Sequence, residues 1–550
     1  MLIDHPLRPG RLASVCGLIV ALGSQAASQL PDQSIPPGNP ITLDKLMLGK
    51  ALFWDEQLSA TGTVACGTCH MPSAGGSDPR SSLAPQASTH PGLDGVYGTA
   101  DDVLGSPGVV RNLADASYAP DPLFGFGPRV TTRKAPSFIN AGFAPSLFWD
   151  GRAKGQFVDP LSGAVLLENF AALETQAAEP PIDAVEMGHE GIAWSAIPPR
   201  IEGLRPLELA SDVPAELAAF VDGATYQQLF EQAFGPGGVT PARIAMALAS
   251  YQRKLVSDQA KILKKPLGFT QLELDGGEVF ANEGRCVACH KGLLFTDHSF
   301  RNTGVRPIGE DRGLGAFTGK PEDDGKFRVP SLLNVGLRAP LFHNGGASSL
   351  AEVVEFYDRG GDFHVNQDPK IEPLGLSDQQ KLELLAYLGT FDDPRVRDEL
   401  PPFDRPTLYS ESGRVPVEYG LATPGSGGFS PDAIAIDPAS ITNTSFALGL
   451  NGALGGAPAI LLIGSGQEPA GISLLGVSWF VALDQPFVQM VTPALDGSGP
   501  GQGYTTTVLD LSTLAPTQIG QSFHGQWAVL DTGSPGGLLS ASEAFALTIF

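Results

Sequence analysis

Apolar residues recur at helical spacing in several segments between residues 41 and 400. One segment begins after Thr42, a helix-capping residue, and extends to about Trp54. Another begins at Thr240, which is followed by a proline at the first helical position. Its apolar stripe consists of Ile244, Leu248, Tyr251 and Leu255. The pattern predicts that both segments are helices with one buried face.

Two more capped segments follow further along the chain. Ser349 opens a segment that carries Tyr357, and Ser377 opens another in which three leucines are expected to face inward. Those leucines are Leu382, Leu385 and Leu388. We also expect a longer helical region from residue 154 to the Glu-Met-Gly-His run at residues 186–189. The chain up to residue 400 is therefore predicted to be mainly α-helical.

The pattern changes to short alternating runs near residue 405. Apolar runs at residues 460–463, 477–481 and 526–530 are separated by turns rich in Gly and Pro. From residue 415 to the end there is no lysine or arginine, and no group of Cys, His and carboxylate residues that could support catalysis. The lone His524 is expected to be structural. This part is therefore predicted to form an all-β sandwich that acts as an accessory module.

The candidate chemistry lies in a run that occurs twice, CGTCH at residues 66–70 and CVACH at residues 286–290. This C-x-x-C-H spacing is the attachment signature of c-type haem, in which two thiols one helical turn apart bind the haem and the histidine binds its iron. A zinc site would need two further ligands at similar spacing. We therefore predict two covalently bound c-type haems. Their attachment residues are Cys66, Cys69, His70, Cys286, Cys289 and His290.

The net charge of the chain and its N-terminal segment limit which partners and which cellular location are expected. The formal net charge of −24 and the pI near 4.7 argue against nucleic acid or an anionic membrane as partner. In residues 1–27, Arg8 and Arg11 precede an apolar run that is too short to span a bilayer. We predict a signal peptide here, hence a periplasmic or secreted protein; a lipid anchor at Cys16 is the alternative. Haem is attached outside the cytoplasm, which agrees with export.

These observations together predict a multidomain protein. Residues 1–27 would be the signal peptide and residues 28–40 a linker. Residues 41–200 and 201–400 would each form a mainly α cytochrome c-like haem domain, and residues 405–550 the all-β sandwich.

Five stretches of the chain resemble the bacterial di-haem cytochrome c peroxidases and their MauG-like relatives. They are LGKALFWDEQLSATGTVACGTCH, APSFINAGFAPSLFWDGRA, AVEMGHEG, GRCVACHKGLLFTDHSFRNTGV and FRVPSLLNVGLRAPLFHNGGASSLAEVVEFYDRGG. The resemblance covers roughly residues 40–395, in the order of the family. It implies two facing haem domains with a calcium ion near their interface. The first (peroxidatic) domain would carry the reactive haem, and the second would accept or store electrons.

The resemblance also implies a sixth ligand for the second iron, which is methionine in the peroxidases and tyrosine in MauG-like members. The matching position is Tyr357, and no methionine occurs between Cys289 and residue 405. Spacing alone is compatible with a core aromatic, because Val353 and Val354 share its face. With the family match we expect Tyr357 to bind the iron.

Peroxide cleavage needs a base that moves a proton between the two oxygens, and a polar group that holds the peroxide. The resemblance implies a glutamate and a glutamine for these roles. Leu147 takes the place expected for the glutamine, and the glutamate matches Glu174 in the Leu-Glu-x-Gln run, beyond an insertion of about sixteen residues. A plain surface glutamate is the alternative for Glu174. Leu147 would make the pocket more apolar, as in relatives that bind dioxygen, such as the rubber oxygenases.

Calcium and one further iron ligand have candidates elsewhere. The resemblance implies calcium held by the backbone carbonyls of Arg338 and Pro340, with His343 either supporting it or forming a buried structural hydrogen bond. The acidic stretch at residues 94–102 could hold calcium or be a solvated loop. His90, in the same long loop, could be a removable sixth ligand of the first iron or a surface histidine.

The leading expectation is an exported oxidoreductase that reduces hydrogen peroxide, with electrons relayed from the second haem to the first. A small redox protein or another donor would supply them, and a homodimer is compatible with the sequence. One alternative is the oxidation of an organic or protein substrate, as in MauG or the rubber oxygenases. The contrasting class is a non-catalytic electron-transfer protein with both irons closed. A binding protein whose β module does the work is a further alternative.

Overall fold

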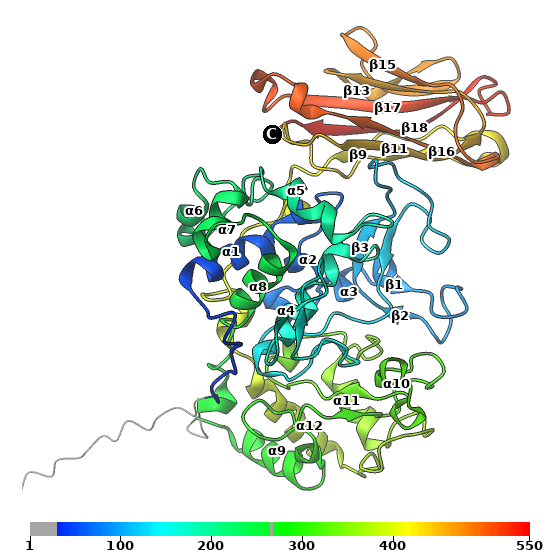
Figure 1. Cartoon of the computed structure of the whole chain (residues 1–550). Helices are drawn as coiled ribbons and strands as arrows, with labels where there is room; N and C mark the ends of the chain where they lie inside the picture. Colours follow the sequence, from blue (N-terminus) through cyan, green and yellow to red (C-terminus); the bar gives the residue numbers. More distant parts are fainter. Residues whose placement is uncertain (1–29, 265–267) are drawn as a thin grey trace, which may run out of the picture.

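The computed structural model describes residues 30–264 and 268–550, so the predicted signal peptide lies outside the described residues. Figure 1 shows three regions in a row. The helical region around α1 (Leu43–Trp54) and α8 (Pro241–Gln252) lies in the middle, with the region of α9 (Gln271–Ala281) and α12 (Asp378–Leu388) at one end. The C-terminal sheets lie at the other end. No helix in the described part of the chain is long and apolar enough to cross a membrane.

The middle region is built on the helices that the apolar pattern predicts. Thr42 and Thr240 cap α1 and α8, each accepting a hydrogen bond from a backbone N–H in the first turn. The two helices cross at Gly49, where a Cβ atom would lie 2.0 Å from the carbonyl oxygen of Ala247. Helices α6 (Ala215–Val221) and α7 (Tyr226–Phe234) also pack on α1. The predicted stripe of α8 is buried in the shared core.

The second helical region has its own core between α9, α11 (Leu350–Asp358) and α12. Ser349 and Ser377 cap α11 and α12 as predicted. The expectation that Leu382 faces inward is wrong, because its side chain is 58% exposed. Leu388 is buried as expected and Leu385 is partly buried against the same core, whereas Leu384 takes the buried position expected for Leu382, since the face of α12 that meets α9 decides which leucines enter the core.

The longer helical region expected after residue 153 is also not present. Residues 157–167 form a hairpin of β5 (Phe157–Val158) and β6 (Val165–Leu167), followed by the six-residue helix α4 (Ala172–Ala177). The reason is local: Asp159 and Gly163 close a turn through their backbone hydrogen bonds, and Gly163 has a positive φ. Helix α4 packs against α8.

The remaining elements of residues 30–400 are short. The helices are α2 (Cys66–Cys69), α3 (Arg80–Leu83), α5 (Ile197–Ile201), α10 (Leu314–Thr318) and α13 (Pro394–Arg397). The strands are β1 (Thr89–His90), β2 (Val103–Leu104), β3 (Pro107–Val110), β4 (Pro128–Val130), β7 (Phe300–Arg301) and β8 (Phe327–Arg328). Residues 30–40 of the segment expected as a linker are described; most of them are exposed, but Asn39 is fully buried and its side chain donates to the carbonyl of Met246.

The C-terminal region consists of antiparallel sheets, as the alternating pattern predicts. A five-stranded sheet has the order β15-β12-β17-β18-β9, a three-stranded sheet the order β10-β11-β16, and β13 pairs with β14. Side chains of the two larger sheets share one core that includes Phe446, Leu461, Trp527 and Phe545. The strands are β9 (Val417–Tyr419), β10 (Asp432–Ile434), β11 (Phe446–Gly455), β12 (Ala459–Gly464), β13 (Gln467–Leu474), β14 (Val477–Val481), β15 (Phe487–Thr492), β16 (Gly499–Leu509), β17 (Ser522–Leu530) and β18 (Leu539–Thr548).

The long loop of the middle region anchors these sheets. The buried Tyr118 donates its hydroxyl hydrogen bond to Asp437 (2.8 Å), and its backbone N–H donates to the Thr506 hydroxyl (2.9 Å). Burial raises the pKa of Asp437 to about 7. His524 lies on β17 with its Nδ1 3.1 Å from the Tyr419 hydroxyl.

Two candidate haem pockets and the wall between them

The first C-x-x-C-H run is a single helical turn that places its side chains in a pocket. Cys66 and Cys69 begin and end α2, and the N–H of His70 donates to the carbonyl of Cys66 (3.1 Å). Gly67 leaves room for the Trp54 ring, which would lie 2.2 Å from a Cβ atom. Both thiols are free, and both line the pocket together with His70.

The second run also forms a single turn, a 3-10 turn over Cys286–Ala288. Cys286, Cys289 and His290 line a second pocket, with the N–H of His290 donating to the carbonyl of Cys286 (2.8 Å). In each run the histidine Nδ1 lies near a carbonyl oxygen, at 3.2 Å for His70 and Gly76, and at 2.9 Å for His290 and Phe295. With the proton on Nδ1, Nε2 of each ring is left for a metal.

The electrostatics of both pockets also fit haem. Burial lowers the pKa of His70 and His290, which favours the neutral imidazole that binds iron. The buried guanidinium of Arg328 lines both pockets, and burial lowers its pKa to about 10. It pairs with no carboxylate in the described part of the chain. A buried cation in this position would suit the anionic propionates of a haem.

Two buried histidine nitrogens without a hydrogen-bond partner also support a bound cofactor. Nδ1 of His298 and Nε2 of His343 have no hydrogen-bond partner within residues 30–264 and 268–550, and both residues line the second pocket. Buried polar atoms are rarely left unpaired, so these atoms are suited to polar groups of a bound cofactor. The residues present therefore fit two c-type haems.

The two pockets share a wall. Lys134, Trp149 and Arg328 line both of them. The indole N–H of Trp149 donates to the carbonyl of Lys134 (2.8 Å), and the N–H of Arg328 donates to the carbonyl of Trp149 (2.8 Å). This chain of hydrogen bonds fixes the Trp149 ring between the two pockets.

Two polar side chains line the first pocket on the edge formed by α4 and the segment after it. Gln176 comes from α4, and Glu186 lies ten residues further along the chain. Burial raises the pKa of Glu186 to about 7, with a smaller contribution from the negative charge of Asp183. Leu147 and Phe148 add apolar surface to the same pocket. A carboxyl group and an amide thus line the pocket that contains His70.

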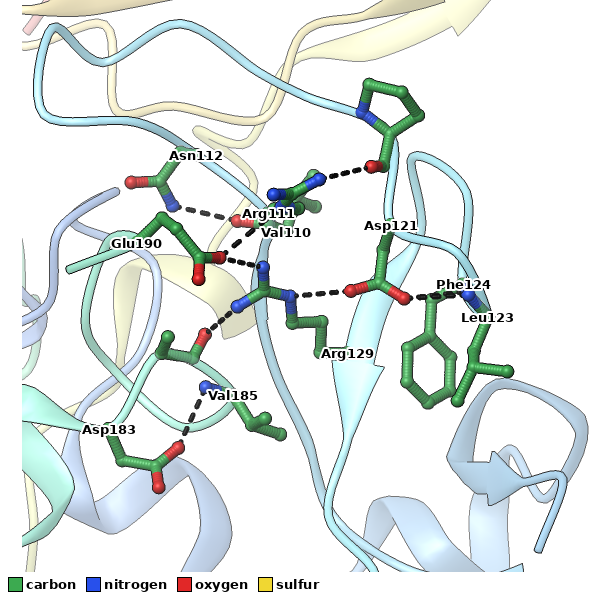
Figure 2. A network of polar contacts seen from close by, with 12 residues as sticks. Val110, Arg111, Asn112, Asp121, Leu123, Phe124, Arg129, Asp183, Val185 and Glu190 are labelled. Atoms are coloured by element: carbon green, nitrogen blue, oxygen red, sulfur yellow. Dashed lines mark hydrogen bonds and ion pairs between the residues drawn. The ribbon is translucent and has the colours of Figure 1, made fainter. Parts of the chain in front are cut away.

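A network of polar contacts around the buried Arg129 holds the segment from Asp183 to Glu190, within which Glu186 lies (Figure 2). The Arg129 guanidinium donates to the carbonyl of Ala184 (2.8 Å), and to the carboxylates of Asp121 (3.0 Å) and Glu190 (2.6 Å). Asp183 accepts hydrogen bonds from the N–H groups of Val185 (2.8 Å) and Glu186 (3.1 Å). The Arg129 contacts tie the chain to the long loop on both sides of Glu186, and Asp183 fixes the backbone N–H of Glu186 locally.

Glu174, the residue expected to move the proton, is not among the residues that line the first pocket. It is fully buried, and both of its carboxylate oxygens accept hydrogen bonds from Arg253, at 2.8 and 2.7 Å. The amide of Asn39 donates to it as well (2.8 Å). Because Glu174 and Gln176 are two positions apart on one helix, they point in different directions. The expectation for Glu174 is therefore corrected, since the structure gives it a structural ion pair.

Sequence reasoning missed Gln176 and Glu186, although both lie in stretches that carried the resemblance. Gln176 ends the Leu-Glu-x-Gln run, and Glu186 belongs to AVEMGHEG. The residue expected in place of the pocket glutamine, Leu147, does line the pocket and is 6% exposed. The pocket nevertheless has an amide, which comes from Gln176 instead.

The other expected ligands are placed as follows. Tyr357, on α11, lines the second pocket with His290, and no methionine is among the described residues that line it. Burial raises the pKa of Tyr357. His90 does not line the first pocket; its Nδ1 accepts a hydrogen bond from the N–H of Gly92 (3.1 Å). Pro340 and Arg338 lie at the second pocket, with the carbonyl oxygen of Arg338 bound by Lys134.

Comparison with known proteins agrees with this geometry. Residues 43–264 match the family model described as di-haem cytochrome c peroxidase. The methylamine utilization protein MauG of Methylorubrum extorquens is 29% identical over 362 residues, which cover 64% of this chain and 80% of that protein. The cytochrome c551 peroxidase of Nitrosomonas europaea is 28% identical over 421 residues, covering 74% of this chain and 99% of the relative.

A solved structure of a MauG-like protein associated with microbial copper homeostasis is 24% identical, with a TM-score of 0.49. The match covers 72% of this chain and 100% of that one.

The paired pockets and the relatives define a peroxidase-type oxidoreductase. Residues 43–264 of the chain match the di-haem cytochrome c peroxidase family, MauG is among the similar proteins, and a match to this family implies two c-type haems.

Proposed function

We propose that the protein reduces hydrogen peroxide to water in the first pocket, with electrons that enter at the second. A haem held by Cys66, Cys69 and His70 would supply the redox-active iron for this two-electron reaction. The observation that carries the proposal is the presence of Glu186 in the pocket of His70, with a pKa of about 7. An acid or base with a pKa near the working pH is the most effective proton carrier.

The roles of the pocket residues follow from their chemistry. The Glu186 carboxylate would accept the proton from one peroxide oxygen and return it to the other, which then leaves as water. The Gln176 amide would hold the peroxide by hydrogen bonds. Leu147 and Phe148 supply apolar surface that limits the access of water.

Other features support the route of the electrons between the two pockets and the cellular location of the protein. The aromatic ring of Trp149 lines both pockets, so it is the side chain best placed to couple them. The net charge of −24 favours a basic redox protein as donor. A periplasmic or secreted location is part of the proposal and depends on the predicted signal peptide.

The spectrum of the oxidised holoprotein tests the central point. An iron with an open coordination position gives a high-spin signal, so we expect one high-spin and one low-spin haem, together with peroxide consumption when a donor is present. Two low-spin haems and no reaction with peroxide would instead identify an electron carrier.

We further propose that Tyr357 is the sixth ligand of the iron bound by His290. Replacing Tyr357 with phenylalanine is expected to change the absorption spectrum of the second haem and to raise its reduction potential, because a phenolate stabilises oxidised iron. Redox titration of the holoprotein measures both effects. The matched control is Tyr387→Phe, which changes a tyrosine on α12 that does not line the pocket. An unchanged spectrum in the Tyr357 variant would refute ligation.

Tyr357 also favours a second candidate function, the oxidation of an organic or protein substrate. A phenolate ligand suits a site that holds oxidising equivalents better than one that stores electrons at high potential. Product formation with dioxygen alone, and none with peroxide, would favour this second function over peroxide reduction.

A further inference from the structure

The calcium ion that the family implies does not fit the place expected for it. The carbonyl oxygen of Arg338, one of its two expected ligands, accepts a hydrogen bond from Nζ of Lys134 at 2.8 Å. The same nitrogen donates to the hydroxyl of Ser77 at 2.5 Å. Lys134 is 4% exposed, so this nitrogen is fixed inside the protein. Calcium binds oxygen ligands at 2.3–2.6 Å, and the lysine nitrogen stands where such an ion would have to approach the carbonyl.

The charges nearby oppose calcium as well. Burial lowers the pKa of Lys134 to about 7, the nearby Arg338 guanidinium lowers it further, and this guanidinium donates to the carbonyls of Ser331 and Leu333. The carboxylate that acts on Lys134 most directly, Asp78, is itself paired with Arg80 at 2.8 Å. Carboxylates are the usual charged ligands of calcium, and among the described residues neither the Lys134 nitrogen nor the Arg338 carbonyl has a carboxylate as hydrogen-bond partner.

Lys134 instead joins the two haem regions by several contacts. Its side chain connects Ser77, which follows the first haem run, with Arg338 of the second region. Its backbone N–H donates to the carbonyl of His343 (2.8 Å), and its carbonyl accepts from Trp149 (2.8 Å). One residue thus holds the wall between the pockets through both its side chain and its backbone.

We propose that Lys134 takes over the structural role of the calcium ion, so that this protein assembles its two haem regions without calcium. The inference goes beyond the proposed function, because it concerns metal dependence and holds for either substrate. The experiments therefore measure the metal content and the thermal stability of the protein, and neither measurement depends on turnover.

The first experiment uses the wild-type holoprotein. After dialysis against a calcium chelator and then against millimolar calcium, metal analysis should find no bound calcium. The temperature of the first thermal transition and the haem spectrum should be the same in both conditions. One calcium ion per chain, or a transition that falls on chelation, would overturn the proposal, whatever the variants do.

The second experiment restores an oxygen ligand with Lys134→Asn. The asparagine is uncharged and offers an amide oxygen beside the Arg338 carbonyl, so this variant should bind one calcium ion per chain. Its first transition should rise by about 4 °C or more between chelator and calcium. If calcium neither binds this variant nor shifts its transition, Lys134 does not stand in the place of a calcium ion, and the proposal fails.

The matched control is Lys45→Asn. Lys45 is also buried, and its Nζ donates to the side-chain oxygen of Asn39 (3.1 Å) and the carbonyl of Pro40 (3.3 Å), within one region. This variant should lose stability without any response to calcium. Lys134→Met, which offers no oxygen, should likewise be less stable and unresponsive. A response to calcium in either control would contradict the assignment to Lys134.

Discussion

Replacing Glu186 with glutamine is expected to lower peroxide turnover by about 10²- to 10⁴-fold. Glutamine keeps the size and polarity of the side chain but cannot take up a proton. Both haems should stay attached, because Glu186 does not contact the attachment cysteines through any described hydrogen bond. Steady-state peroxide reduction with a reduced donor measures the effect, and haem stain and pyridine spectra check the haem content.

The pH profile provides a second readout for Glu186. The carboxylate must be deprotonated to accept a proton, and its pKa is about 7. Wild-type turnover should therefore be highest above pH 7 and fall as the pH drops through 7 and the group becomes protonated. The residual activity of Glu186→Gln should not show this decrease below pH 7. The control is Glu168→Gln, an exposed glutamate outside the pocket, which should behave like the wild type. Unchanged turnover in Glu186→Gln would rule out its role.

Replacing Glu174 with alanine is expected to lower the free energy of unfolding by about 3–5 kcal/mol. The change removes one partner of a fully buried ion pair and leaves the charge of Arg253, 1% exposed at its side chain, without compensation. Denaturant unfolding of the holoprotein measures the loss. The folded fraction should retain turnover within a few-fold of the wild type, because Glu174 does not line the first pocket.

A double variant separates stability from chemistry. Glu174→Leu combined with Arg253→Met replaces the ion pair with apolar side chains of similar volume, and should recover most of the lost stability. A Glu174→Ala protein that is as stable as the wild type but inactive would restore the catalytic role expected from the sequence. The two glutamate variants thus distinguish a proton carrier from a buried structural carboxylate.

The sequence by itself determined the local parts of this protein. Each C-x-x-C-H run is encoded within five residues, because one helical turn sets the positions of both thiols and the histidine. The starts of α1, α8, α11 and α12 were predictable for the same reason, since a capping side chain bonds to an N–H two or three residues away. The alternating pattern likewise identified strands in the C-terminal region.

Only the tertiary structure decided which polar groups meet. Nothing in the sequence distinguishes the roles of Glu174 and Glu186. Because α4 packs on α8, Glu174 forms an ion pair with Arg253, whereas Glu186 lines the pocket of His70. Lys134 meets the carbonyl of Arg338 across 204 residues of chain. Such contacts depend on how separate regions pack together, and residue types or short-range spacing do not contain that information.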